Sequence, residues 1–305
     1  MGIGLIFPGQ GSQQVGMGAS FVEHHTQARE LFEQANDALG FDLKKLCLQG
    51  PEEELTLTYN GQAAILTVAT IAMRLLSERV ALAPIALAGH SVGEYSALVA
   101  TGALEFADAV RTVYQRGKFM QSATPVGIGA MAAILGAEPE EVERLCQEAA
   151  QGQVVQPANF NTPGQIVISG HTEAVKRVLE QAKGKLLTVS APFHSALMQP
   201  AADNMRPVLQ GLKFKAARWP VVANYDNRFL TAAEAFPQSL EKQIVAPVRW
   251  SEGVSAMVAQ GVDTFVELGH GKILTGMLKR IDKSVRGLNV QDDASLSETI
   301  KTLGG

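Results

Sequence analysis

The stretch Gly89-His90-Ser91-Val92-Gly93-Glu94 places a serine between two glycines, at the point where a predicted strand gives way to a predicted helix. The apolar run 84–88 before it is long enough for a buried strand, and the segment 95–100 after it is rich in helix-compatible residues. Glycines two positions before and after the serine allow a sharp turn and keep Cβ atoms away from the hydroxyl. The pattern therefore predicts a nucleophilic serine on a strand-to-helix turn.

Backbone N–H groups that could bind an anion are expected on both sides of this serine. The first N–H groups of a helix have no partner within the helix, so the predicted helix presents them, with that of Val92, to a bound carbonyl. A second source is the loop Pro8-Gly9-Gln10-Gly11-Ser12, which follows a predicted strand at 3–7. This loop lacks the third glycine of a dinucleotide site and the lysine of a P-loop. Its N–H groups could instead donate to an oxyanion together with that of Val92.

A serine hydroxyl is a poor nucleophile until a neighbouring base removes its proton. The histidines available are His24, His25, His90, His171, His194 and His270. The first two lie in a polar stretch where solvent exposure is expected, His171 stands before a predicted helix as a cap or surface residue, and His90 is expected to have a supporting role. His194 lies in a loop where the chain leaves an inserted segment, and His270 lies in a glycine-flanked loop after a strand. Both remain candidates for the base.

Arg116 lies in a predicted amphipathic helix at 106–122. One interpretation is an ordinary surface arginine. The other is a guanidinium group that holds a substrate carboxylate through two parallel hydrogen bonds. The spacing of residues leaves both open.

The order of predicted elements indicates an α/β fold with an insertion. Strands predicted at 3–7 and 84–88 alternate with helices predicted at 26–39, 62–78 and 106–122. Such alternation is typical of a mainly parallel sheet. From residue 124 to 191 the order becomes β-α-β-β-α-β, the ferredoxin-like arrangement. Its elements are expected at 130–135, 139–150, 154–159, 165–169, 172–183 and 186–189. Strands at 219–223 and 264–268 and a helix at 273–281 then resume the first style. We therefore predict a core of residues 1–123 and 192–305 with an inserted subdomain at 124–191.

Composition excludes several classes of protein. The 305 residues are 46% hydrophobic and 18% charged, with a net charge of −4, which favours a large core and argues against a nucleic-acid-binding protein. Cys47 and Cys146 show no CxxC spacing, so neither a disulfide framework nor a zinc site is expected. The N-terminus does not resemble a signal peptide, and no run of about 18 apolar residues could span a membrane. We expect a soluble cytoplasmic protein that does not bind membranes.

Six segments together carry a family resemblance over nearly the whole chain. They are 7–13, 89–94, 115–121, 159–165, 193–195 and 271–276. In this order they closely resemble the malonyl-CoA:acyl carrier protein transacylases. The resemblance implies an α/β-hydrolase-like core with a mainly parallel sheet, plus an inserted ferredoxin-like subdomain.

The resemblance also implies a role for each motif residue. Ser91 would be the acyl-accepting nucleophile and His194 its base, which decides against His270. The backbone N–H groups of Gln10 and Val92 would form the oxyanion hole.

Two further roles are implied for arginines. Arg116 would hold the malonyl carboxylate. A main-chain carbonyl orients the histidine in this family, and within the segment 246–250 we expect it to be that of Arg249.

The sequence departs from the family pattern at three places. Ala246 replaces an asparagine, His270 replaces a proline in Gly-Pro-Gly-Lys, and Ala63 replaces a proline. The roles of His270 and Lys272 are left open. Phe193, directly before His194, resembles the residue of malonyl-selective relatives.

The implied reaction is a ping-pong transfer of malonyl from malonyl-CoA to the phosphopantetheine thiol of acyl carrier protein, in support of fatty-acid synthesis. It requires no cofactor and no metal, since a thioester is already activated, and we expect a monomer. One alternative is an acyltransferase of a polyketide synthase or malonate decarboxylase system. Others are a serine esterase or thioesterase, which would place an acidic residue between serine and histidine in the chain, and a silent carrier-binding scaffold.

Overall fold

The computed structural model describes residues 1–304, and its largest sheet is built around the first strand. The six strands run in the order β10-β9-β1-β2-β7-β8. Each neighbouring pair is parallel except β7 and β8, which are antiparallel at one edge. The strands are β1 (Ile3–Phe7), β2 (Ala86–Gly89), β7 (Val221–Val222), β8 (Phe229–Leu230), β9 (Thr264–Leu268) and β10 (Arg286–Val290). The mainly parallel sheet predicted from the alternation of elements is confirmed.

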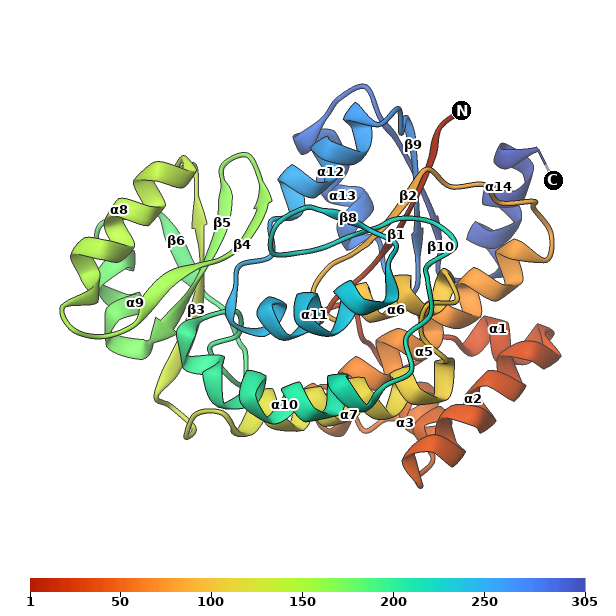
Figure 1. Ribbon diagram of the computed structural model, residues 1–305, viewed down its shortest axis with the longest axis horizontal. Coiled ribbons are helices and arrows are strands. Elements are labelled where there is room, and N and C mark those ends of the chain that lie inside the picture. The colour runs from red at the N-terminus through yellow and green to blue at the C-terminus, as the bar shows by residue number, and fades with distance from the viewer. Residues whose placement is uncertain (305) are drawn as a thin grey trace.

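Helices cover both faces of this sheet (Figure 1). Successive residues of β1 point to opposite faces, so Leu5 and Phe7 pack in the core with α5, α7 and α14, whereas Ile6 packs against α12 and α13. The helices outside the antiparallel unit are α1 (Ala19–His24), α2 (Thr26–Leu39), α3 (Leu43–Gln49), α4 (Glu52–Leu55), α5 (Thr58–Ser77), α6 (Gly93–Ala100), α7 (Phe106–Ser122), α10 (Gln199–Gly211), α11 (Phe236–Val245), α12 (Trp250–Ala259), α13 (Ile273–Ile281) and α14 (Asp293–Leu303).

A second, antiparallel sheet lies to one side, in green at the left of Figure 1. Its order is β4-β5-β3-β6, formed by β3 (Gly129–Leu135), β4 (Val155–Thr162), β5 (Gln165–His171) and β6 (Gly184–Leu186). Helices α8 (Pro139–Ala150) and α9 (Thr172–Leu179) pack on one face, where Ile168 joins a separate small core. On the other face Met131 and Val167 belong to the main core. The antiparallel sheet therefore packs its second face directly against the part of the chain that contains the parallel sheet.

Several predicted boundaries differ from those observed. Helix α5 begins at Thr58 rather than at residue 62, and its first turn is tied down by Gln121, whose side chain accepts from the Thr58 N–H at 3.0 Å. Helix α9 ends at Leu179 instead of 183, and β6 covers 184–186 instead of 186–189. Strand β6 begins at Gly184, which pairs with Ile134 and lies too close to the Ala133 carbonyl to carry a side chain.

Within residues 1–304, no helix combines the length and the apolar character that crossing a bilayer would require.

Candidate active site

The turn between β2 and α6 holds Ser91 in a strained conformation. Ser91 has φ +52°, in the left-handed region that side-chain-bearing residues seldom adopt. A Cβ on Gly89 would lie 1.9 Å from the Gly93 carbonyl carbon, and one on Gly93 would lie 2.3 Å from the Phe7 carbonyl oxygen. Neither position accepts another residue without a backbone shift. The predicted strand-to-helix turn, with glycine required on both sides of the serine, is thus confirmed.

His194 contacts this serine directly. The Ser91 Oγ and His194 Nε2 atoms are 2.8 Å apart, and His194 Nδ1 lies 2.9 Å from the carbonyl oxygen of Gln243. Since a carbonyl only accepts, Nδ1 carries the proton and Nε2 is left to accept from the serine hydroxyl. Burial and the nearby Arg116 charge lower the pKa of His194 to about 3. The imidazole is therefore neutral at pH 7, the state a base needs.

The carbonyl that orients His194 is that of Gln243, so the prediction of Arg249 was wrong. The Arg249 carbonyl accepts from the Gly253 N–H in the first turn of α12, and its side chain pairs with Glu252. Gln243 lies near the end of α11, where its carbonyl would ordinarily accept from the residue four positions later. That residue is Pro247, which has no N–H, so the carbonyl is left for the histidine.

Arg116 lies on α7 and is completely buried, which rules out the surface interpretation. Its guanidinium donates to Gln62 Oε1 and Gln243 Oε1, each at 2.8 Å, and to Ser91 Oγ at 3.2 Å. Within residues 1–304, its Nε has no hydrogen-bond partner. All its acceptors are neutral oxygens, so the positive charge is solvated by dipoles but not cancelled by direct contact with an anion. Such a group is suited to an anionic ligand.

The two predicted oxyanion donors flank Ser91. Val92 immediately precedes α6, and Gln10 lies in the loop after β1. The loop packs closely on the serine turn, because a Cβ on Gly9 would lie 2.5 Å from the His90 carbonyl oxygen. In the part of the chain that the structure describes, neither the Gln10 nor the Val92 N–H has a protein acceptor.

These groups open into one cavity of about 690 Å³. Gln10, Ser91, Arg116 and His194 line it, together with residues of the antiparallel sheet such as Met131. The cavity therefore lies at the junction of the two units, as the position of the His194 loop suggested.

The other candidate base lies elsewhere. His270 is absent from the lining of this cavity and lies 3.4 Å from Gln14 in an adjoining hollow. Lys272 is an exposed residue at the start of α13.

His90 is within 2.9 Å of Asn161 on β4, so it links the serine turn to the antiparallel sheet, a supporting position. His171 precedes α9 and its Nδ1 accepts from the Val154 N–H.

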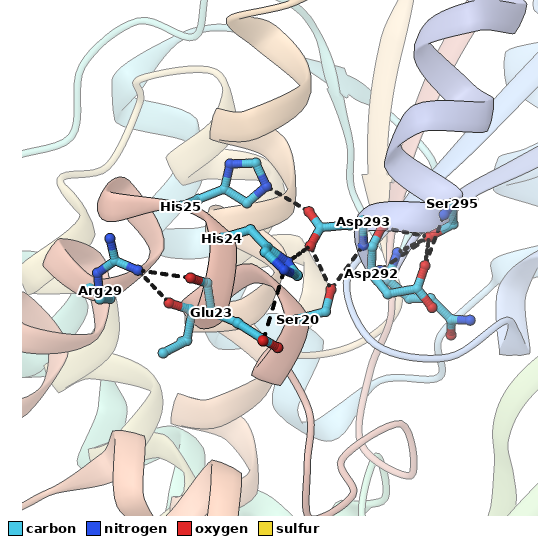
Figure 2. Close-up of polar contacts among 10 residues, drawn as sticks. Ser20, Glu23, His24, His25, Arg29, Asp292, Asp293 and Ser295 are labelled. Carbon is cyan, nitrogen blue, oxygen red and sulfur yellow. Dashed lines mark hydrogen bonds and ion pairs between the residues drawn. The ribbon is translucent and has the colours of Figure 1, made fainter.

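His24 and His25 were expected to be solvent-exposed, but both make hydrogen bonds to a side chain from another part of the fold. His24 Nδ1 lies 2.6 Å from one carboxylate oxygen of Asp293, at the start of α14, and His25 Nε2 lies 2.6 Å from the other (Figure 2). The His25 side chain is only 19% exposed, whereas that of His24 is 58% exposed. Ser20 joins the same carboxylate, so the cluster fastens the N-terminal helices to the C-terminal one. Neither histidine lines the cavity.

Other reactive groups lie away from Ser91. Burial raises the pKa of both Cys47 and Cys146 to about 12, which keeps these free thiols protonated. Within residues 1–304, no cluster of three or more His, Cys, Asp or Glu side chains is arranged to hold a metal ion.

Comparison with known proteins identifies the family to which the chain belongs. The profile of the acyl transferase domain family matches residues 5–302. The malonyl CoA-acyl carrier protein transacylase of Escherichia coli K12 is 46% identical over 303 residues, covering 97% of this chain and 98% of that protein. The enzyme of the same name from Bacillus subtilis strain 168 is 43% identical, covering 99% and 97%.

Solved structures give the same result. The malonyl CoA-acyl carrier protein transacylase of Coxiella burnetii superimposes with a TM-score of 0.97 at 42% identity, covering 100% of this chain and 98% of that one. A malonyl-transacylase solved in complex with a type II polyketide synthase acyl-carrier protein gives a TM-score of 0.96 at 44% identity, covering 99% and 100%. This chain therefore belongs to the malonyl-CoA:acyl carrier protein transacylases of the acyl transferase family.

Proposed function

We propose that this chain transfers the malonyl group of malonyl-CoA to the phosphopantetheine thiol of an acyl carrier protein, with Ser91 as the carrier of the acyl group between the two. The observation that carries the proposal is the meeting of three groups in one cavity. The Ser91 hydroxyl lies 2.8 Å from a neutral imidazole nitrogen of His194 and 3.2 Å from the buried guanidinium of Arg116.

The first half-reaction forms a malonyl-serine ester. Ser91 Oγ attacks the thioester carbonyl while His194 Nε2 takes the hydroxyl proton, and the N–H groups of Gln10 and Val92 stabilise the negative oxygen. The intermediate collapses, the carbon–sulfur bond breaks, and His194 returns the proton to the sulfur of CoA. In the second half-reaction the carrier thiol gives its proton to His194 and attacks the ester. The serine then leaves and regains the proton.

Arg116 supplies selectivity for a dicarboxylic acyl group. An apolar cavity penalises a buried carboxylate that has no partner, and a guanidinium fork offsets this penalty. Because the guanidinium also touches Ser91 Oγ, a malonyl carboxylate held there would place the thioester carbonyl close to the nucleophile.

The proposal includes a finer assignment of the fold. Residues 1–123 and 192–305 would form an α/β-hydrolase-like core, and residues 124–191 a ferredoxin-like insertion. Two observations support this division: the chain order β3-α8-β4-β5-α9-β6 and the sheet order β4-β5-β3-β6. All the residues proposed to act come from one chain, so a monomer suffices for the reaction. Fatty-acid synthesis is the proposed pathway. The alternative is a polyketide carrier, because a similar malonyl-transacylase was solved in complex with a type II polyketide synthase acyl-carrier protein.

Initial rates with both substrates varied test the proposed transfer. We expect malonyl to appear on the carrier thiol, with parallel double-reciprocal lines, because CoA leaves before the carrier protein reacts. A carrier whose phosphopantetheine is absent is the matched control and should accept nothing. Release of free malonate without carrier labelling would instead identify an esterase or thioesterase, and intersecting lines would contradict the serine-bound intermediate.

A further inference from the structure

Glu94 is a buried carboxylate, three residues after Ser91, that the transfer chemistry does not use. It lies in the first turn of α6 and is 2% exposed. Burial raises the pKa of Glu94 to about 7, with a smaller raising effect from Asp226, against the lowering effects of Gln243, Asn224 and Arg116. The hydrogen bonds of this carboxylate lead back to the active site along two branches.

The first branch reaches the serine turn through Asn224. Glu94 Oε2 accepts from the Asn224 backbone N–H at 3.1 Å. The Asn224 side chain then binds the turn at two points, because its Oδ1 accepts from the Ser91 N–H and its Nδ2 donates to the Gly89 carbonyl, both at 2.7 Å. A serine with φ +52° keeps its conformation only where its surroundings enforce it. Asn224, held by Glu94, is part of that enforcement.

The second branch reaches Arg116 and His194 through Gln243. The same oxygen of Glu94 accepts from Gln243 Nε2 at 2.8 Å, and that nitrogen also donates to the Ser91 carbonyl at 3.0 Å. The remaining amide atom, Gln243 Oε1, accepts from the Arg116 guanidinium at 2.8 Å. An amide has one accepting and one donating end. Because Glu94 and the Ser91 carbonyl require the donating end, the accepting end must face Arg116.

This orientation decides what surrounds the guanidinium. If the Gln243 amide were reversed, its NH₂ group would face the donors of Arg116, and the arginine would lose an acceptor in a fully buried position. The amide also separates Glu94 from Arg116. A direct ion pair would compete with an incoming carboxylate, whereas a carboxyl group one amide away leaves the guanidinium available to the substrate.

We propose that Glu94 is a positioning residue, which fixes the Gln243 amide so that Arg116 is held ready for the malonyl carboxylate and fixes Asn224 so that the Ser91 turn is maintained. The inference rests on the proposed function, since it concerns selection of malonyl by that site. Glu94 touches neither the substrate nor the reacting atoms and acts through its two neighbours.

The test is the ratio of malonyl to acetyl transfer in variants of Glu94. Glu94→Leu removes the acceptor, and we expect the ratio to fall by on the order of 10-fold or more, the scale for loss of a group that orients a ligand-binding side chain. Glu94→Gln keeps one acceptor oxygen and should recover part of the ratio. In an Arg116→Ala background, Glu94→Leu should change the ratio no further, because both act through one guanidinium.

Glu267→Gln is the matched control. Glu267 is likewise a buried carboxylate, on β9, and it accepts from the Leu274 and Thr275 N–H groups at the start of α13. This control should lower Tm and leave the ratio unchanged. If Glu94→Leu also lowers Tm without changing the ratio, Glu94 is merely structural and the inference is wrong.

A second variant covers the case in which Glu94→Leu does not fold. Gln243→Leu removes the same side-chain link while keeping the backbone carbonyl that binds His194, so it should lower the ratio equally, and an unchanged ratio would overturn the inference. Failure of the proposed function is distinguishable from both outcomes, because the wild-type protein would then form no malonyl-serine ester.

Discussion

Replacement of His194 by alanine is expected to slow malonyl transfer by on the order of 10³-fold or more. The hydroxyl of Ser91 would lose the base whose Nε2 lies 2.8 Å away. The loss should appear in both half-reactions, since the same nitrogen takes the serine proton in one and the carrier thiol proton in the other. Transient kinetics of the free enzyme with malonyl-CoA, and of the malonylated enzyme with carrier protein, would measure the two steps separately.

Two controls accompany this prediction. His270→Ala should have a mild effect, because that ring lies outside the cavity. Combining His194→Ala with Ser91→Ala should cost little more than either change alone, since the pair acts as a unit. A large loss at His270 with a small one at His194 would reverse the assignment.

The lowered pKa of His194 offers a further check. An NMR titration should find the ring still neutral at pH 5, because burial and Arg116 lower the pKa to about 3. An unfolded chain would bind this proton near pH 6.5. The contribution of His194 to stability is therefore present above pH 6.5 and is lost as the pH falls toward 3. A ring that titrates near 6.5 in the folded protein would contradict the buried, neutral base.

Replacement of Arg116 by alanine is expected to raise the activation free energy of malonyl transfer by roughly 3–5 kcal/mol, the scale for removing one partner of a buried charge pair. The rate should therefore fall by about two to four powers of ten. Acetyl transfer should change little, because an acetyl group brings no charge into the cavity. Lysine should rescue malonyl transfer only in part, since a point charge cannot reproduce the fork. Parallel assays with malonyl-CoA and acetyl-CoA measure the difference.

Arg111 provides a control on the same helix. It is exposed and pairs with Asp108, so Arg111→Ala should leave both acyl transfers unchanged. If malonyl and acetyl transfer fall together in Arg116→Ala, the arginine holds the site together and does not select the substrate.

Local patterns were sufficient to predict the serine turn. The pattern Gly89-x-Ser91-x-Gly93 is itself local and marks the turn, although the contact that excludes a side chain at Gly93 is with the Phe7 carbonyl on a distant strand. The boundaries of α2, α7 and α8 agree with their predicted ranges for the same reason, since each follows from a helical period and its flanking residues. The order of elements in the antiparallel unit also follows from local signals.

Contacts between distant segments could not be predicted in this way. Gln243 accepts from His194, yet nothing near Gln243 identifies its carbonyl except the proline four residues later. Arg116 resembles many surface arginines, and only the fold surrounds it with Gln62 and Gln243. Helix α10 was missed because it contains Pro207 in its interior, where proline ordinarily ends a helix. Each of these features depends on tertiary packing.

The most direct test of the proposed function is the site of the acyl group on the enzyme. Brief mixing with malonyl-CoA, acid quenching and peptide mass spectrometry should locate a single malonyl group on the peptide that contains Ser91, and Ser91→Ala should carry none. Malonyl found on Cys47 or Cys146, or an enzyme that transfers malonyl while never carrying it, would contradict a serine-bound intermediate.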